Sequence, residues 1–338
     1  MAVQHTDQRS AWPRVGGIVL LLTALLSVIM IAFAWPATRA GVHDIPLAVA
    51  GPPQATGAVV EQLNAKRAGA FDVTVVADTA AAEKLIKDRE VYGAIDLSSG
   101  HPQVIIASAA SPAVAQALQQ IAQGLGQQPG EAPAVRDLVP LPADDPRGAG
   151  LAAGALPLVL GGIIAAGLLT NLVAGIGRRV VGALVFAITG GLALVAILQY
   201  WLGSLEGDYW TNSSVVALSI SATALTLLGL EALFGVAGLG AGGAVMMLLG
   251  NPLSGLTSAP EMLPSGWGLL GQYLPPGAAG SLLRSTAFFD GGGATPHLLV
   301  LAGWAVLGLL LVGAASLRPR GRRDAGATAT EGERLVAA

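Results

Sequence analysis

The stretch from residue 151 to residue 176, LAAGALPLVLGGIIAAGLLTNLVAGI, contains no charged side chain. A helix needs about 20 mostly apolar residues to cross the hydrocarbon core of a bilayer, and this stretch is long enough. The same composition continues as far as Leu317, with only eight charged residues on the way. These are Arg178, Arg179, Glu206, Asp208, Glu231, Glu261, Arg284 and Asp290. The sequence therefore predicts a polytopic α-helical membrane protein.

Apolar runs of comparable length predict about six spans in the whole chain. Their expected bounds are residues 15–35, 151–176, 180–202, 214–237, 239–256 and 296–317. The fifth is the shortest and the richest in glycine. The first is longer than the apolar core of a cleaved signal peptide, which has roughly 7–15 residues. Although Ala32-Phe33-Ala34 resembles a cleavage site, we expect a retained anchor.

The overall composition supports a membrane protein with one water-exposed domain. The 338 residues are 53% hydrophobic and 12% charged, with a formal net charge of −3, whereas soluble domains average about 25% charged residues. This argues against a soluble enzyme, a nucleic-acid-binding protein and a disordered chain. The chain has no cysteine, which excludes disulfides and thiolate chemistry.

Basic residues gather in three short segments around the predicted spans. They are Arg9, Arg14, Arg178, Arg179, Arg318, Arg320, Arg322 and Arg323. With six spans, all three segments lie on one side of the membrane, and the positive-inside rule makes that side the cytoplasm. We therefore expect a multi-pass plasma-membrane protein with a cytoplasmic tail at 1–14 and a disordered cytoplasmic tail at 318–338.

Residues 36–150 are then expected to form a small α/β extracytoplasmic domain and linker between the first two spans. Alternating and helical spacing predicts the order β-α-β-α-β-β-α. The expected strands are 45–50, 71–76, 92–97 and 103–108, and the expected helices are 55–68, 79–89 and 111–125. Prolines at 140, 142 and 146 predict that residues 127–150 form an extended, fairly stiff connection back to the membrane.

No motif for catalysis, cofactor binding or metal binding is present. A nucleotide-binding P-loop needs Gly-Lys followed by Ser or Thr, and none of the three lysines, Lys66, Lys84 and Lys87, follows a glycine. The four histidines lack partners at metal-ligand spacing. Residues 238–243 superficially resemble a dinucleotide-binding loop, but we interpret them as a tight turn with close helix packing. We therefore expect no enzymatic activity, cofactor or metal.

Glu231 stands well inside the fourth predicted span, where an ionisable side chain is costly. Two interpretations remain open from the sequence. The carboxylate takes part in proton coupling or substrate contact, or it lies near the cytoplasmic interface and is paired there.

The segment near residues 252–290 is broken by prolines and is too polar to span, so we expect an outer re-entrant hairpin within a five-helix membrane domain at 151–317. Four short elements precede the last span in a fixed order: Ser254-Gly255, Pro260 to Pro264 (PEMLP), Leu274-Pro275 and Leu283-Arg284. Their order resembles that of the type-2 ABC exporter permeases, and most closely the phage infection protein branch. The resemblance covers nearly the whole chain.

This resemblance implies the transmembrane permease subunit of an export system for amphipathic or lipid-like substrates. It implies contact with membrane lipids, a homo- or heterodimer and a possible separate ABC ATPase subunit. The candidate translocation or gating residues are Glu231, Asn251, Pro252, Ser254, Gly255, Pro260, Glu261, Pro264, Pro275 and Arg284. The candidate cytoplasmic docking residues are Arg178 and Arg179.

One departure from the family leaves two alternatives open. The loop between the second and third spans is little more than residues 175–179, so docking surface for an ATPase is scarce. The first alternative is an ATPase-independent envelope scaffold or accessory protein, of the phage-receptor or secretion-accessory type. The second is a proton-coupled exporter that uses Glu231.

Overall fold

Five helices in the described part of the chain are long and apolar enough to cross a membrane. The computed structural model describes residues 12–99, 101–125 and 134–317, so the predicted tails at 1–14 and 318–338 lie largely or wholly outside it. The five helices are α1 (Trp12–Arg39), α5 (Ala149–Leu172), α6 with its π-helical end η1 (Ile176–Ala196 and Ile197–Trp201), α7 (Tyr209–Phe234) and α11 (Ala294–Leu317). The prediction of a polytopic helical membrane protein is confirmed.

The fifth predicted span, 239–256, differs from the structure. Its place is taken by the 9-residue α8 (Val236–Ala244) and the 6-residue π-helical η2 (Val245–Gly250), which together are shorter than the five candidate spans. The predicted turn at 238–243 is also wrong, because these residues are helical. The chain turns earlier, at Gly235, whose φ of 67° ends α7 in the left-handed region that glycine adopts without strain.

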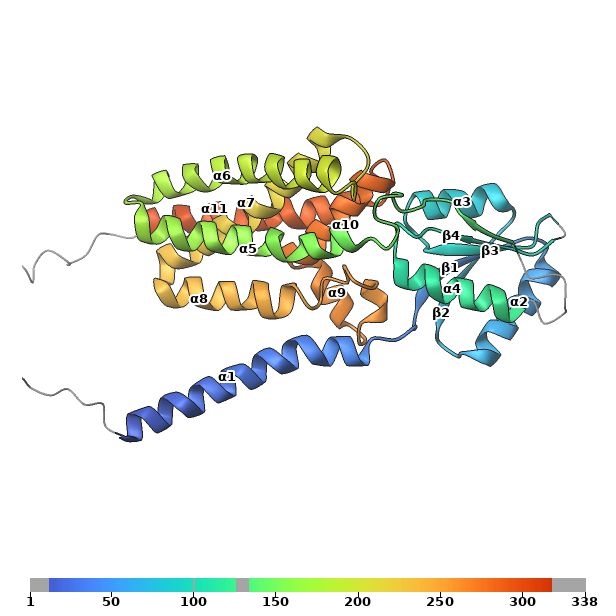
Figure 1. Ribbon diagram of the computed structural model, residues 1–338, viewed down its shortest axis with the longest axis horizontal. Coiled ribbons are helices and arrows are strands. Elements are labelled where there is room, and N and C mark those ends of the chain that lie inside the picture. Colours follow the sequence, from blue (N-terminus) through green and yellow to red (C-terminus); the bar gives the residue numbers. More distant parts are fainter. Residues whose placement is uncertain (1–11, 100, 126–133, 318–338) are drawn as a thin grey trace, which may run out of the picture.

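Three of these helices, α5, α6 and α11, pack around α7, as Figure 1 shows. Helices α5, α6, α10 (Pro275–Phe288) and α11 all contact α7, and most of its residues are buried. Several of them are serines and threonines. The Thr226 hydroxyl, for example, donates a 3.0 Å hydrogen bond to the Trp304 carbonyl. Hydroxyls of this kind bind neighbouring helices within an apolar bundle.

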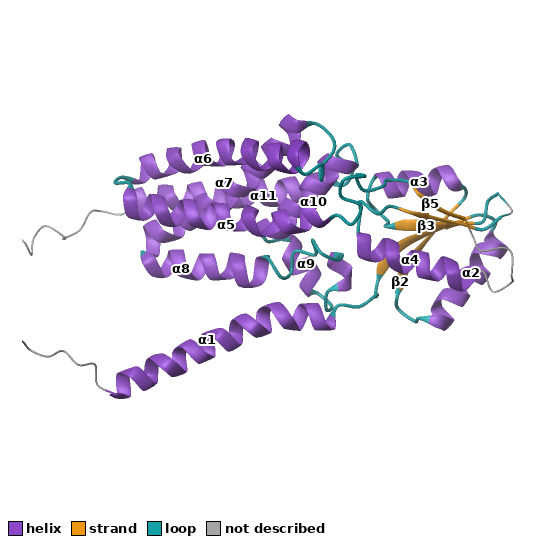
Figure 2. Cartoon of the chain, in the orientation of Figure 1, coloured by secondary structure: helices purple, strands orange, loops and turns teal. Residues whose placement is uncertain are grey.

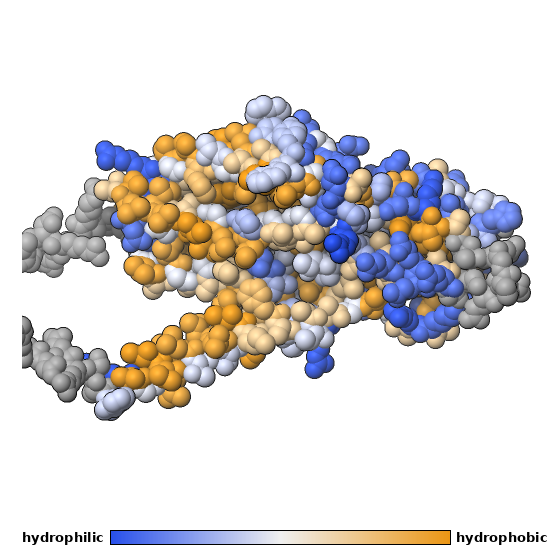
Figure 3. Space-filling view, viewed as in Figure 1, coloured by the Kyte–Doolittle hydropathy of each residue, from blue (hydrophilic) through white to orange (hydrophobic). Residues whose placement is uncertain are grey.

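Helix α1 lies apart from this bundle (Figure 1). Only Pro36 of its 28 residues is buried, and its apolar surface is visible along most of its length in Figure 3. Near the end of the helix, Trp35 meets Trp267 edge to face, with ring centroids 5.4 Å apart. Helix α1 is thus held mainly at its C-terminal end.

The α/β domain lies beyond one end of the bundle and has a five-stranded sheet in the order β2-β1-β3-β4-β5 (Figure 2). The strands are β1 (Ile45–Ala50), β2 (Phe71–Val76), β3 (Gly93–Asp96), β4 (Gln103–Ile106) and β5 (Ala134–Asp137). Only the β3–β4 pair is antiparallel. The predicted order of elements is present, but β5 was missed, because it lies inside the stretch expected to be a linker.

Helices cover both faces of this sheet. Helices α2 (Pro53–Lys66) and α4 (Pro112–Leu125) bury Leu63 and Leu118 against alternate β1 residues such as Leu47. Helix α3 (Thr79–Lys87) buries Ile86 on the opposite face. The period-2 alternation of the strands therefore separates two cores, as expected for a three-layer α/β unit.

The chain between α8/η2 and α11 joins the two parts of the molecule. We call residues 251–293 the collar. It contains η3 (Pro260–Met262), α9 (Trp267–Gln272) and α10. Ala259 and Met262 pack into the core beneath α2 and α4, and Phe289 packs into the core beneath α3. Helix α10 is almost wholly buried and shares the bundle core with α5, α7 and α11. The predicted hairpin near 252–290 is thus a folded collar between bundle and sheet.

Candidate functional site

A cavity of about 350 Å³ opens where the collar meets the α/β domain and α11. We call it the seam cavity. Its polar lining residues come from four separate parts of the chain and include His43, Arg89, Tyr92, Glu261, Gln272 and His297. It brings together more polar side chains than any of the other three cavities discussed below.

Arg89 connects the α/β domain to α10 at this cavity. Its Nη1 donates hydrogen bonds to the Ser281 carbonyl at 2.7 Å and to the Ser285 hydroxyl at 2.6 Å. The guanidinium also lies 5.5 Å from the centre of the Phe289 ring, which is within cation–π range. Burial lowers the pKa of Arg89 below its ordinary value, but an arginine stays charged in proteins. A fixed positive charge therefore lies at the wall of the seam cavity.

Tyr92 and Glu261 form the second polar link between domain and collar. The Tyr92 hydroxyl donates to Glu261 Oε2 at 2.7 Å, although the two residues are 169 positions apart in the chain. Burial raises the pKa of the Tyr92 hydroxyl, and the neighbouring Glu261 carboxylate raises it further. Tyr92 consequently keeps its proton at physiological pH and acts as a donor to the carboxylate.

The collar is held together by its own hydrogen bonds. Gln272 Nε2 donates to the Ser254 carbonyl at 2.9 Å, and Gln272 Oε1 accepts from the Ser281 hydroxyl at 2.6 Å. The Ser254 hydroxyl donates to the Asn251 carbonyl at 2.8 Å. Gly255 follows with a φ of 69° and turns the chain tightly against Pro260. Through Gln272 this network reaches the seam cavity.

The predicted gating residues fall into three groups. Pro260 and Glu261 line the seam cavity itself, while Pro264 lines the neighbouring cavity described below. The residues that shape the collar without lining either cavity are Asn251, Pro252, Ser254, Gly255, Pro275 and Arg284. Glu231 alone forms the third group; it lies near the α7–α8 turn at the opposite end of the bundle, where the predicted docking residues Arg178 and Arg179 follow the α5–α6 turn (Figure 1).

Arg284 is buried behind the cavity and is 5% exposed. Its Nη2 donates to the Leu256 carbonyl at 3.2 Å. Its Nε is buried with no hydrogen-bond partner among the described residues. Arg284, the arginine of the predicted Leu-Arg element, therefore stabilises the backbone of the collar from a buried position.

Sequence reasoning missed several residues of the seam cavity, above all Arg89, Tyr92, Gln272 and Ser281. Arg89 and Tyr92 belong to the α/β domain, and nothing in their local sequence indicates that they face the collar. Arg89 has a φ of 60°, which is unusual for a residue other than glycine. Such a conformation becomes visible only in the folded chain.

An apolar groove of about 410 Å³ runs between α1 and the bundle. We call it the α1 groove. It is lined by Val28, Ile31 and Trp35 on one side and by Leu248, Leu249 and Trp267 on the other. A third cavity shares Trp35 with the groove and His43, Asp44 and Ser265 with the seam cavity. The three therefore lie side by side, from an apolar to a polar environment, and we call this series the track.

Glu231 is paired in the structure. Its Oε2 accepts a 2.9 Å hydrogen bond from Arg179 Nη1, and the two side chains are 16% and 20% exposed. Arg179 Nε also donates to the Val173 carbonyl at 2.8 Å, which ties the α5–α6 turn to α7. The pairing expected in the second interpretation of Glu231 is therefore present. Arg179, expected to be a docking residue, is engaged within the chain.

Replacing Glu231 by glutamine is expected to lower the free energy of unfolding by about 1–3 kcal/mol, because the Arg179 charge then lacks its counterion in a largely buried place. Thermal unfolding in detergent measures the effect. Arg179→Gln should lower the free energy of unfolding by a similar amount. The double variant should lower it by less than the sum of the two single effects. Full additivity would contradict a direct interaction.

Comparison with family models, curated proteins and solved structures gave no match to this chain. Within the described residues, no group of three or more His, Asp or Glu side chains is arranged to hold a metal ion. The function of the chain is therefore inferred from the geometry of its cavities.

Proposed function

We propose that this chain is the transmembrane permease subunit of an export system for amphipathic or lipid-like molecules. The observation that carries the proposal is the track, in which the apolar α1 groove, the third cavity and the polar seam cavity are linked by shared lining residues. In this proposal the protein lies in the plasma membrane with both termini in the cytoplasm and the α/β domain outside. Termini on the same side require an even number of crossings. In this proposal α8 and η2, although shorter than the five candidate spans, supply the sixth.

The track suits a molecule that has one apolar and one polar end. An apolar tail in the α1 groove contacts leucine, isoleucine and tryptophan side chains, and each buried methylene contributes about 0.8 kcal/mol. The polar end meets Arg39 and His43 first and then Arg89 and Gln272 in the seam cavity. Binding sites commonly combine such apolar walls with a few placed polar groups.

The proposal includes a dimer and a separate ATPase. The chain has no P-loop lysine, so ATP-driven export requires another subunit. The short α5–α6 turn leaves Arg178 as its exposed cation, since Arg179 is bonded to Glu231. An ATPase would then dock on the small surface around the α5–α6 turn or on the terminal tails.

A scaffold or accessory role is the second candidate. It is favoured by the firm attachment of the α/β domain to the collar, through Arg89, Tyr92 and the packing of Phe289. A proton-coupled exporter that uses Glu231 has less support, because Arg179 neutralises that carboxylate.

Filling the α1 groove tests the transport proposal directly. Ala32 lines this groove, and Ala32→Trp places an indole in the space for a tail. If the indole displaces two methylenes of that tail from the groove, the affinity for the molecule falls about tenfold. We therefore expect a comparable fall in export. The measurement is outward movement of a fluorescent phospholipid in vesicles that contain the chain, with and without any ATPase that co-purifies from native membranes.

Ala24→Trp is the matched control, because Ala24 is an exposed residue of the same helix and does not line the groove. It should leave export unchanged. Equal export by both variants, or no export by the unmodified protein with its purified partners, would argue against a permease and in favour of the scaffold.

A further inference from the structure

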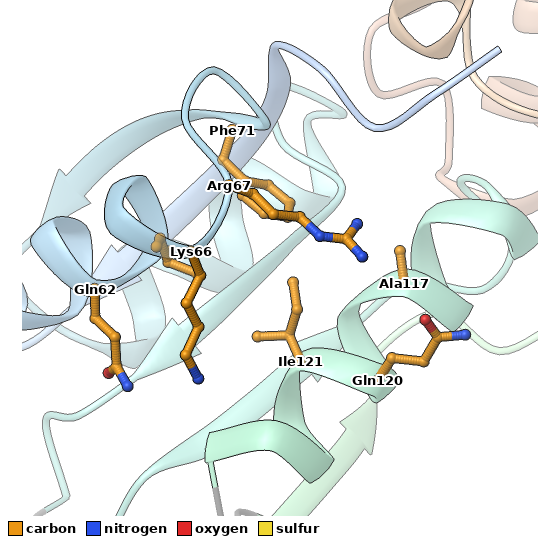
Figure 4. A pocket seen from close by; sticks show the side chains of 8 residues that line it. Gln62, Lys66, Arg67, Phe71, Ala117, Gln120 and Ile121 are labelled. Carbon is orange, nitrogen blue, oxygen red and sulfur yellow. The ribbon is translucent and has the colours of Figure 1, made fainter. Parts of the chain in front are cut away.

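A separate cleft of about 180 Å³ lies in the α/β domain between α2 and α4. Figure 4 shows side chains from both helices around it. Gln62, Leu63 and Lys66 come from α2, and Ala117, Gln120 and Ile121 come from α4. It shares no lining residue with the seam cavity or the α1 groove. We call it the domain cleft.

Two cations face the domain cleft because of a local departure from helical geometry. Neighbouring residues on a helix point about 100° apart, which follows from 3.6 residues per turn. Arg67, however, has left α2, with φ of −150° and ψ of 83°. Its side chain extends toward Ala117 of α4, whereas the side chain of Lys66 points in another direction and ends on the other side of Ile121 (Figure 4).

These cations have no partner within the described part of the chain. Neither the Lys66 ammonium nor the Arg67 guanidinium forms an ion pair or hydrogen bond there, and no acidic side chain lines the cleft. An anion that enters the cleft therefore meets two cations and no competing carboxylate among the lining residues.

The floor of the cleft is apolar. Leu63 is 6% exposed, and Phe71 and Ile121 are partly buried against the same core. The volume is below the roughly 300–1,000 Å³ of pockets for drug-sized ligands. A ligand must therefore be compact, with an apolar body on the floor and a negative group near Lys66 and Arg67.

We propose that the domain cleft binds a small organic monoanion with a flat apolar body, such as an aromatic carboxylate. The carboxylate lies between Lys66 and Arg67, the ring rests on Phe71 and Ile121, and the Gln120 amide provides a further polar contact. This site is independent of the transport track and gives the exposed domain a ligand of its own.

Calorimetry of 2-naphthoate with the full chain in nanodiscs of zwitterionic lipid tests the proposal, with empty nanodiscs as the blank. Lys66→Gln and Arg67→Gln should each weaken binding by about tenfold. Both residues are exposed, so the variants should fold, which size-exclusion chromatography checks. Lys87→Gln is the matched control, since Lys87 is exposed on α3 outside the cleft, and it should bind like the parent protein.

Two analogues separate the parts of the proposal. The neutral 2-naphthamide should not bind, which tests the charge, and inorganic phosphate should bind much more weakly, which tests the apolar floor. The proposal is overturned by absence of naphthoate binding to the unmodified chain, by undiminished binding in both glutamine variants, or by equal binding of either analogue.

Discussion

Replacing Gly271 by alanine is expected to abolish the folded form of this protein. An added Cβ at Gly271 would fall on the Leu253 carbonyl group, which belongs to the collar backbone and has no rotamer through which to move away. Gly268 faces the Pro260 carbonyl in the same manner. Helix α9 must then separate from the chain beside it. We therefore expect the free energy of unfolding to fall by more than about 4 kcal/mol.

Size-exclusion chromatography in detergent measures this loss as the fraction of monodisperse protein. Gly303→Ala in α11 is the control, because an added Cβ there meets no atom within 4 Å. That variant should be neutral or slightly stabilised, since alanine is the better helix former by about 1 kcal/mol. A monodisperse Gly271→Ala protein with normal thermal stability would show that the collar is not packed as described.

Replacing Arg89 by methionine is expected to loosen the α/β domain from the bundle. The variant keeps an apolar side chain over Phe289 but leaves the Ser285 hydroxyl and the Ser281 carbonyl without their donor. Unpaired buried polar groups cost about 1–3 kcal/mol each. We therefore expect lower thermal stability and faster hydrogen exchange in α10.

Arg89→Lys should be intermediate, because one ammonium cannot reproduce the planar geometry that spans both acceptors. Arg147→Ala is the control, since Arg147 is exposed in the connection before α5. If hydrogen exchange in α10 were identical in Arg89→Met and the parent protein, the hydrogen bonds of Arg89 would not hold the domain in place.

The membrane character and most element bounds follow directly from the sequence. The uncharged run at 151–176 corresponds to α5 within a few residues, and the alternation in 71–76 matches β2 in full. Both signals are local, since they depend on length and periodicity. The fifth span was predicted poorly, because the chain turns at Gly235, inside the predicted fourth span, and continues as a short helix with a π-helical end, neither of which apolarity reveals.

The candidate site was predicted only in part, for a different physical reason. The prolines and Glu261 of the collar stand out in the sequence because they interrupt an apolar region. Arg89 and Tyr92 do not stand out, since a charged and an aromatic residue after a helix in an α/β domain are ordinary. Their role arises from contacts across 169 or more positions in the chain, and such pairings depend on how the domain sits on the bundle.

The attachment of α1 at one end makes the width of the α1 groove depend on bilayer thickness. The Gly41 amide donates to the Met262 carbonyl at 2.9 Å, and Trp35 contacts Trp267 nearby, whereas the preceding turns of α1 are exposed. A helix held in this way accommodates a thinner or thicker hydrocarbon layer by changing its tilt. Each change of tilt widens or narrows the α1 groove, so lipid composition and lateral pressure act directly on its capacity.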